Sequence, residues 1–201
     1  MVGGCRRDEE DGCFNGVGMR FRFFLPRSIY NFVAISHVYC YNYIIQNTIL
    51  RDKFQFEEVN MFIELVRLKH GDSDLDELIR IHQEPSVSRF LSTSDNYFKY
   101  VTGTEGVDYY KIIVDGILVG GIHSEIDSNT VSLSICVDEK HRCLGIAEKS
   151  LQKFFSLLPS AVKTIEVYIE ETNIPSILLF QKLGFQTSEK EQELIKYCKL
   201  L

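Results

Sequence analysis

The sequence contains no Cys-x-x-Cys pair, and this absence restricts the metal and disulfide chemistry that it could support. Its six cysteines stand at irregular spacings, at positions 5, 13, 40, 136, 143 and 198. Structural zinc sites and small disulfide scaffolds place their cysteines in pairs or at regular spacings. We therefore expect no metal site and no disulfide framework, and we expect reduced thiols in a cytoplasmic protein.

Runs of basic residues are also missing after residue 27, and the formal net charge is −6. Proteins that bind nucleic acid need clustered Lys and Arg to neutralise phosphates. We therefore expect no nucleic-acid partner. A length of 201 residues and a hydrophobic content of 45% suit one soluble globular domain with room for an appendage.

Residues 1–60 do not follow the pattern of the rest. Residues 1–18 are rich in glycine and charge, and residues 29–50 are aromatic and uncharged between Arg27 and Arg51. A membrane anchor would need a denser apolar run, because Asn, Ser, His, Gln and Thr interrupt this one. No signal-peptide cleavage site stands out either. We therefore expect no membrane anchor, and a loosely packed extension is a second interpretation.

A third interpretation, which we favour, concerns the start of the native chain. The residues Glu57-Glu58-Val59-Asn60-Met61 can be encoded by codons that place a purine-rich GGAGG shortly before an ATG. A bacterial ribosome-binding site would look like this if it were translated. We therefore predict an N-terminal extension at residues 1–60, as a non-native leader or a disordered segment, and one globular domain at residues 61–201.

From Met61 the hydrophobic pattern becomes regular. Residues 62–68 alternate and predict a first strand. Asp74, with Glu77 three residues later, predicts a capping box at the start of a helix that Pro85 ends. We interpret His82 as a residue on the face of this helix rather than as a ligand. Shorter helical segments are predicted at 87–91 and 96–101.

Asp115-Gly116 separates two apolar runs, residues 109–114 and 117–123, and this is a strong signal for a β-hairpin. A turn at residues 127–129 then leads into residues 131–137. In this stretch Val, Leu and Ile alternate with Ser and Cys, which predicts a central strand with one apolar face.

A helix follows the central strand, since apolar residues recur at helical spacing from Ala147 to Leu158. Residues 164–170 predict another strand, and the strand-helix-strand order indicates a parallel crossover. A last helix runs from Pro175 to Gly184. We predict a final hairpin from residues 185–187 and 194–198 around an acidic loop at residues 188–193.

The loop Arg142–Ala147 connects the central strand to its helix. A helix N-terminus carries unpaired backbone N–H groups and the positive end of the helix dipole. Gly145 would let a bulky ligand approach the backbone, and Ala147 would keep the first turn small. The loop therefore predicts an anion site.

The pattern Arg-x-x-Gly-x-Ala at residues 142–147 resembles the pyrophosphate loop of the GNAT N-acetyltransferase superfamily, Gln/Arg-x-x-Gly-x-Gly/Ala. The segment Asn173–Phe185 resembles the family's later Asn-x-x-Ala/Ser-x-x-Leu-Tyr-x-Lys-x-Gly-Phe, in the same order and spacing. The resemblance covers about residues 62–201. It implies an α/β (α+β) GNAT fold: a mixed, mostly antiparallel sheet with helices on both faces and a splayed central strand pair.

The resemblance also implies acetyl-CoA as co-substrate. The pantetheine would pair with backbone near Ile135, Cys136 and Val137, like an added strand. The pyrophosphate would rest on the loop Arg142, Cys143, Leu144, Gly145, Ile146 and Ala147. Asn173 would bind the pantetheine arm or hold the strand end, with Ser176 in the same segment, and Phe180 and Lys182 would lie near the CoA tail.

The sequence departs from the family at the usual catalytic positions. Phe180 stands where a Tyr often acts as general acid, and Val131 stands where some members carry a Glu base. Glu125, His123 and Tyr168 are the remaining catalytic candidates, and each of them also has a plain structural interpretation. A base acting through water, or catalysis by positioning, stays open. No Gly-x-Ser-x-Gly motif is present, and a Cys143–His141 thiol nucleophile would need a third orienting group.

Residues 84–91 resemble an Asp-Pro-x-Val-x-Arg-Phe/Tyr-Leu element of relatives that act on ribosomal-protein N-termini. The resemblance implies that Arg89 or Phe90 touches the acceptor. We therefore expect an enzyme that moves an acetyl group from acetyl-CoA to the primary amine of a small molecule or a protein N-terminus. The alternative is a non-catalytic acyl-CoA-binding module. The sequence leaves open whether the chain is a monomer or a homodimer.

Overall fold

The computed structural model describes residues 61–201, and every prediction for residues 1–60 lies outside the described residues. The strands are β1 (Ile63–Arg67), β2 (Val107–Val114), β3 (Ile117–Asp127), β4 (Thr130–Val137), β5 (Thr164–Glu170), β6 (Gln186–Glu191) and β7 (Leu194–Leu200). The helices are α2 (Leu75–Gln83), α3 (Pro85–Ser88), α4 (Tyr97–Gly103), α5 (Ile146–Phe155) and α6 (Ile174–Lys182). A short 3-10 turn, η2, spans Glu139–His141.

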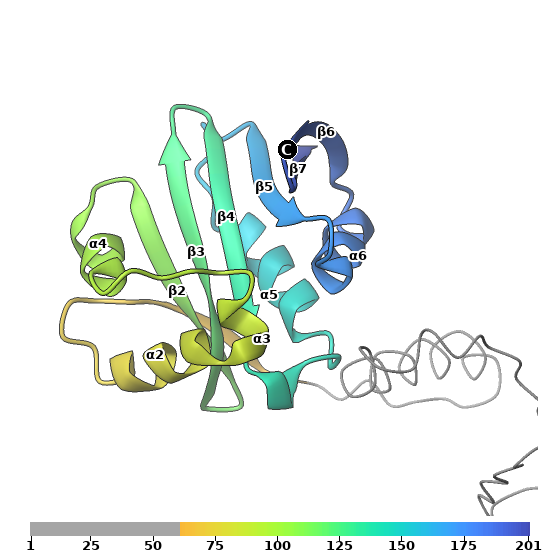
Figure 1. Cartoon of the computed structure of the whole chain (residues 1–201). Coiled ribbons are helices and arrows are strands. Elements are labelled where there is room, and N and C mark those ends of the chain that lie inside the picture. Colours follow the sequence, from red (N-terminus) through yellow and green to blue (C-terminus); the bar gives the residue numbers. More distant parts are fainter. Residues whose placement is uncertain (1–60) are drawn as a thin grey trace, which may run out of the picture. The chain divides into compact units, whose positions relative to one another are not determined.

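The seven strands form one sheet in the order β1-β2-β3-β4-β5-β7-β6. Neighbouring strands pair antiparallel except β4 and β5, which are parallel and are connected through α5. The predicted hairpin is confirmed, because Asp115 and Gly116 both adopt positive φ, at 50° and 83°, between β2 and β3. The mixed, mostly antiparallel sheet that the resemblance implied is therefore present (Figure 1).

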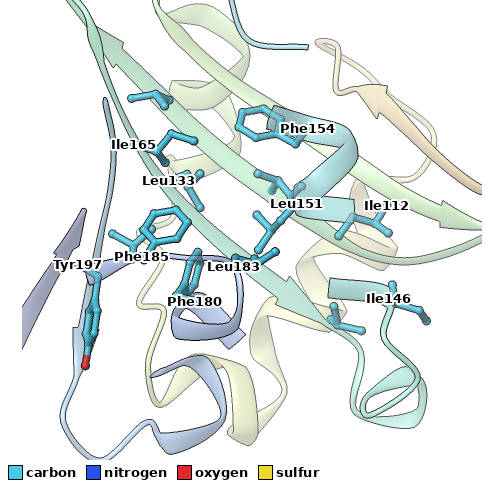
Figure 2. Packing of buried hydrophobic residues seen from close by; sticks show 14 of the residues in the cluster. Ile112, Leu133, Ile146, Leu151, Phe154, Ile165, Phe180, Leu183, Phe185 and Tyr197 are labelled. Carbon is cyan, nitrogen blue, oxygen red and sulfur yellow. The ribbon is translucent and has the colours of Figure 1, made fainter. Parts of the chain in front are cut away.

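One face of the sheet packs against α5 and α6. Leu151 and Phe154 of α5 and Phe180 of α6 are buried against the apolar side chains of β4 and β5. Figure 2 shows these side chains gathered around Leu133 and Ile165. This core explains the alternation of β4, since its apolar residues face the helices and its Ser and Cys residues face the other way.

The opposite face packs against α2, α3 and α4. Leu78 of α2 and Val101 of α4 are buried against Tyr109 of β2, while Ile81 and Val87 pack on Cys136 of β4. His82 lies on the helix as expected, and its side chain is buried there. The polar and small side chains of β4 therefore lie on the face that carries α2 to α4.

The predicted capping box at the start of α2 is wrong. Asp74 makes no side-chain cap, and Glu77 instead binds the Arg80 guanidinium. The carboxylates of Asp72 and Asp74 accept hydrogen bonds from Nζ of Lys111 at 2.8 and 2.6 Å. Lys111 is buried, so its ammonium needs these partners, and that requirement takes Asp74 away from the helix end.

The prediction of an acidic loop at residues 188–193 is also wrong. β6 extends to residue 191 and pairs with β7, and the connection is only Gln192 and Glu193, with Gln192 at φ 56°. β6 is the edge of the sheet, and an edge strand tolerates charged, polar side chains. β7 lies between β5 and β6, so it supplies side chains to the middle of this half of the sheet.

None of the helices within residues 61–201 has the length and apolar content that crossing a membrane would require.

Candidate active site

The two parallel strands β4 and β5 pair only at their beginnings. Thr130 to Ser132 pair with Thr164 to Glu166, and beyond these residues β5 pairs only with β7. β4 continues to Val137, so its edge toward β5 has no strand partner there among the described residues (Figure 1). The splayed pair that the resemblance implied is confirmed, and the predicted Ile135, Cys136 and Val137 lie along the open part of β4.

The helix α5 begins at the mouth of this gap without a side-chain cap. Gly145 occupies the N-cap position in the left-handed conformation, with φ 78°, and Cys143 also has a positive φ of 60°. Within residues 61–201, the backbone amides of Leu144, Gly145, Ile146 and Ala147 have no protein acceptor. The start of this helix therefore has the free donors and the positive dipole end that bind anions.

Arg142 ties the loop to the end of β4. Its Nε donates a hydrogen bond of 2.9 Å to the carbonyl oxygen of Val137. Lys182 of α6 forms an ion pair of 2.6 Å with Glu148 in the first turn of α5. Two cations therefore lie close to the free amides, where they would add charge-assisted bonds to a diphosphate.

The segment Asn173–Phe185, the second one predicted to contact the cofactor, has a clear structural role. Oδ1 of Asn173 accepts a hydrogen bond of 3.4 Å from the amide of Ser176, which caps α6. Phe180 is only 3% exposed and packs edge-on against Phe185, with ring centroids 5.0 Å apart. The structure thus gives Phe180 a core role, and contact of this segment with a cofactor stays a prediction.

The pairing register brings polar side chains to both sides of the gap, on the face of α2 to α4. On β3 and β4, His123 lies opposite Ser134. On β5 and β7, Tyr168 lies opposite Lys196. Ser134 is two residues beyond Ser132, where β4 and β5 last pair, so the gap separates the His123 side from the Tyr168 side.

His123 and Glu125 form a pair on β3. Nε2 of His123 lies 3.2 Å from Oε1 of Glu125, and the Tyr100 hydroxyl donates a 3.0 Å hydrogen bond to the same oxygen. Burial lowers the pKa of His123, although Glu125 acts in the opposite direction. His123 is therefore neutral at neutral pH and is able to accept a proton.

A second polar group on this face was not predicted. Glu166 of β5 accepts a 2.6 Å hydrogen bond from Oγ of Ser132 and forms a 2.8 Å ion pair with Lys196. Burial acts to raise the pKa of Glu166, but the hydrogen bonds from Lys196 and Ser132 outweigh it and leave this pKa lowered. The period of two in β5 places Glu166 and Tyr168 on one face, but Lys196 joins them only through the position of β7.

A hollow of about 670 Å³ lies beside the closed end of the gap. Its lining includes Tyr100, Glu125, Asp127, Ser132 and Glu166. Several carboxylates thus border the space next to the last paired residues of β4 and β5. An ammonium group is the kind of acceptor that such a lining attracts.

The predicted acceptor residues Arg89 and Phe90 follow α3. The Arg89 guanidinium lies over the Phe90 ring, 5.1 Å from its centroid, and Arg89 is exposed. Neither residue is part of the lining of the hollow, so the structure does not bring them together with Glu125 and Glu166. Their contact with an acceptor stays a prediction.

Comparison with known proteins agrees with this arrangement. The model of the acetyltransferase (GNAT) family matches residues 75–185, which include both motif segments. An N-alpha-acetyltransferase of Sulfurisphaera tokodaii is 31% identical over an alignment 134 residues long, which covers 57% of this chain and 75% of that protein.

Solved structures share the fold at lower identity. A domain from Methanocaldococcus jannaschii has a TM-score of 0.61 at 20% identity, covering 71% of this chain and all of that one. The Campylobacter jejuni N-acetyltransferase PseH in complex with acetyl coenzyme A has a TM-score of 0.56 at 15% identity, covering 69% and 99%. From the extent of the family match, the chain belongs to the acetyltransferase (GNAT) family and is an acyltransferase with acetyl-CoA as its co-substrate.

Proposed function

We propose that residues 61–201 transfer the acetyl group of acetyl-CoA to a primary amine, and that this amine is the N-terminus of a polypeptide. The observation that carries the proposal is the open gap between β4 and β5, with the free amides of α5 at its mouth. A thioester cofactor needs such a slot, because its pantetheine is extended and its pyrophosphate is anionic.

The cofactor would bind along the open edge of β4. Its pantetheine amides would pair with backbone near Ile135 to Val137, and its pyrophosphate would accept bonds from the amides of Leu144 to Ala147. Gly145 supports this placement, since its positive φ and missing side chain leave the donors accessible.

The choice of a polypeptide N-terminus rests on two observations. The relative from Sulfurisphaera tokodaii is named for acetylation of α-amino groups. The hollow beside the gap is lined by carboxylates, and its volume of about 670 Å³ leaves room for more than a bare ammonium. A small-molecule amine is the other acceptor class, and it becomes one arm of the test.

The proposed proton transfers use the two sides of the gap. Glu125, which lines the hollow, would take a proton from the acceptor ammonium and share it with His123, whose Nε2 lies 3.2 Å away. Tyr168, which is 45% exposed on the opposite side, would protonate the departing thiolate. One side of the gap would thus accept a proton, and the other side would donate one.

Release of free CoA thiol tests the proposal when acetyl-CoA is offered with a panel of short peptides and a panel of small amines. We expect turnover with peptides that have a free N-terminus, and none with the same peptides after N-terminal blocking. Turnover confined to small amines would overturn the choice of a polypeptide N-terminus, and absence of turnover on both panels would overturn the proposal that the acceptor is a primary amine.

A non-catalytic acyl-CoA-binding module is the alternative that the sequence left open, because Phe180 and Val131 are buried and stand where the family often carries a Tyr acid and some members carry a Glu base. The family match and the N-alpha-acetyltransferase relative favour the acyltransferase over this alternative. Calorimetry separates the two, because a sensor would bind acetyl-CoA tightly without consuming it on any amine.

A further inference from the structure

We propose that Lys196 is a positioning residue for acetyl transfer, which holds Tyr168 at the open side of the gap so that its hydroxyl can protonate the leaving thiolate. This inference rests on the proposed function. It adds a residue from β7, a strand outside the two motif segments.

The geometry is a continuous set of contacts around the closed end of the gap. Ser132 donates to Glu166 at 2.6 Å, and Glu166 binds Nζ of Lys196 at 2.8 Å. Nζ of Lys196 lies 5.5 Å from the centroid of the Tyr168 ring. Because Ser132 and Glu166 are the last paired residues of β4 and β5, these contacts fix Tyr168 relative to the point where the strands separate.

The environment of Lys196 suits this role. Hydrogen bonding to Glu166, and then to Tyr168, raises the pKa of Lys196, so its ammonium stays charged in the neutral range. The cation lies over the ring and holds the phenol in place through the attraction between an ammonium group and an aromatic face. Tyr168 itself is 45% exposed, so its ring would have freedom to rotate away without this contact.

The acceptor ammonium loses one proton to Glu125 and His123, and the free amine attacks the thioester carbonyl. When the tetrahedral intermediate collapses, the C–S bond breaks, its electron pair goes to sulfur, and sulfur takes the proton of the Tyr168 hydroxyl. The second proton of the attacking nitrogen returns to Tyr168 through water, so one proton is released to solvent for each acetyl transferred.

The test compares kinetic constants of Lys196→Gln, Lys196→Arg, Tyr168→Phe and the Gln/Phe double variant, with acetyl-CoA and a peptide acceptor. We expect Lys196→Gln to lower kcat about tenfold, a part of the usual contribution of a general acid, with both KM values within about twofold. Lys196→Arg should recover most of kcat. The double variant should be no slower than Tyr168→Phe alone, because both changes remove one function.

Lys190→Gln is the matched control, since it breaks another Lys–Glu pair, with Glu171 at 2.5 Å, away from the contacts of Tyr168. Its kcat should equal that of the wild type. If Lys196→Gln fails to fold, Glu166→Gln carries the test, because it releases Lys196 while keeping the side-chain shape.

An unchanged kcat in Lys196→Gln, or additive losses in the double variant, would overturn the inference while wild-type turnover upholds the proposed function. A wild-type protein that turns over no amine would instead overturn the proposed function itself. A fall in melting temperature with kcat unchanged would show that Lys196 only stabilises the sheet.

Discussion

Nε2 of His82 and the hydroxyl of Tyr109 lie 2.8 Å apart in the interior between α2 and the sheet. Sγ of Cys136 lies 3.6 Å from the same nitrogen, while Nδ1 of His82 has no partner among residues 61–201. Burial lowers the pKa of His82 to about 4, and the nearby His123 adds to this shift. The imidazole must therefore stay neutral in the folded protein.

The first prediction concerns acid stability. The pKa of His82 is lowered by folding, from 6.5 to about 4, so the unfolded chain binds a proton first as the pH falls. The contribution of the neutral His82 imidazole to the free energy of unfolding is complete above pH 6.5. It is lost as the pH falls from 6.5 to 4, and the loss is about 3 kcal/mol at most. Urea unfolding at several pH values in this range measures the loss.

The control is His82→Gln, which keeps a hydrogen-bonding group near Tyr109 but does not titrate. The slope of unfolding free energy against pH should be smaller in this variant than in the wild type, since His123 and the carboxylates are common to both. Equal slopes would show that His82 binds protons equally in the folded and unfolded chains, as an imidazole accessible to water does.

The second prediction concerns Gly121, which lies between Lys111 of β2 and Cys136 of β4. A Cβ at this position would collide with the phenol of Tyr109. We expect Gly121→Ala to lower the free energy of unfolding by about 1–3 kcal/mol, as overpacking does. Gly103→Ala is the control, because a Cβ there meets nothing within 4 Å. Equal stability of the two variants would contradict the packing described.

The third prediction concerns the start of α5. Gly145→Glu should weaken acetyl-CoA binding on the order of 100-fold, about 2.7 kcal/mol, because bulk and negative charge would face the diphosphate. Isothermal titration gives the affinity. Gly71→Glu is matched in backbone conformation, with φ 72° and open space, and lies before α2. It should bind as the wild type does, and an unaltered affinity of the Gly145 variant would refute the anion site.

The fourth prediction concerns the open edge of β4. Acetyl-CoA should slow hydrogen exchange in residues 133–137 through added backbone bonds, while residues 186–191 of the edge strand β6 should be unaffected. At a ligand concentration of about 100 times the dissociation constant, the bound state gains about 2.7 kcal/mol. Protection confined to other regions of the domain would place the cofactor elsewhere.

Local patterns predicted the parts of the fold that depend on neighbouring residues. The strand at residues 164–170 and the turn at Asp115-Gly116 follow from alternation and turn chemistry, and both are present. The loop before α5 was predicted for the same reason, since Gly145 adopts the conformation that glycine favours.

Other features depend on residues that are distant in the chain. The capping box failed because Lys111, 37 residues beyond Asp74, takes its carboxylate. The partner of Tyr168 could not be predicted because it needed the position of β7 between β5 and β6. Tertiary contacts of this kind leave no periodic signal in the sequence.

The short seam between β4 and β5 has a consequence for motion. It holds two half-sheets together through three residue pairs, whereas β3 and β4 share eight. Bending at this seam breaks few hydrogen bonds, so we expect it to be the least resisted deformation of the described domain. Such bending widens the gap between β4 and β5 directly. The free CoA product can then leave after each turnover while every strand stays intact.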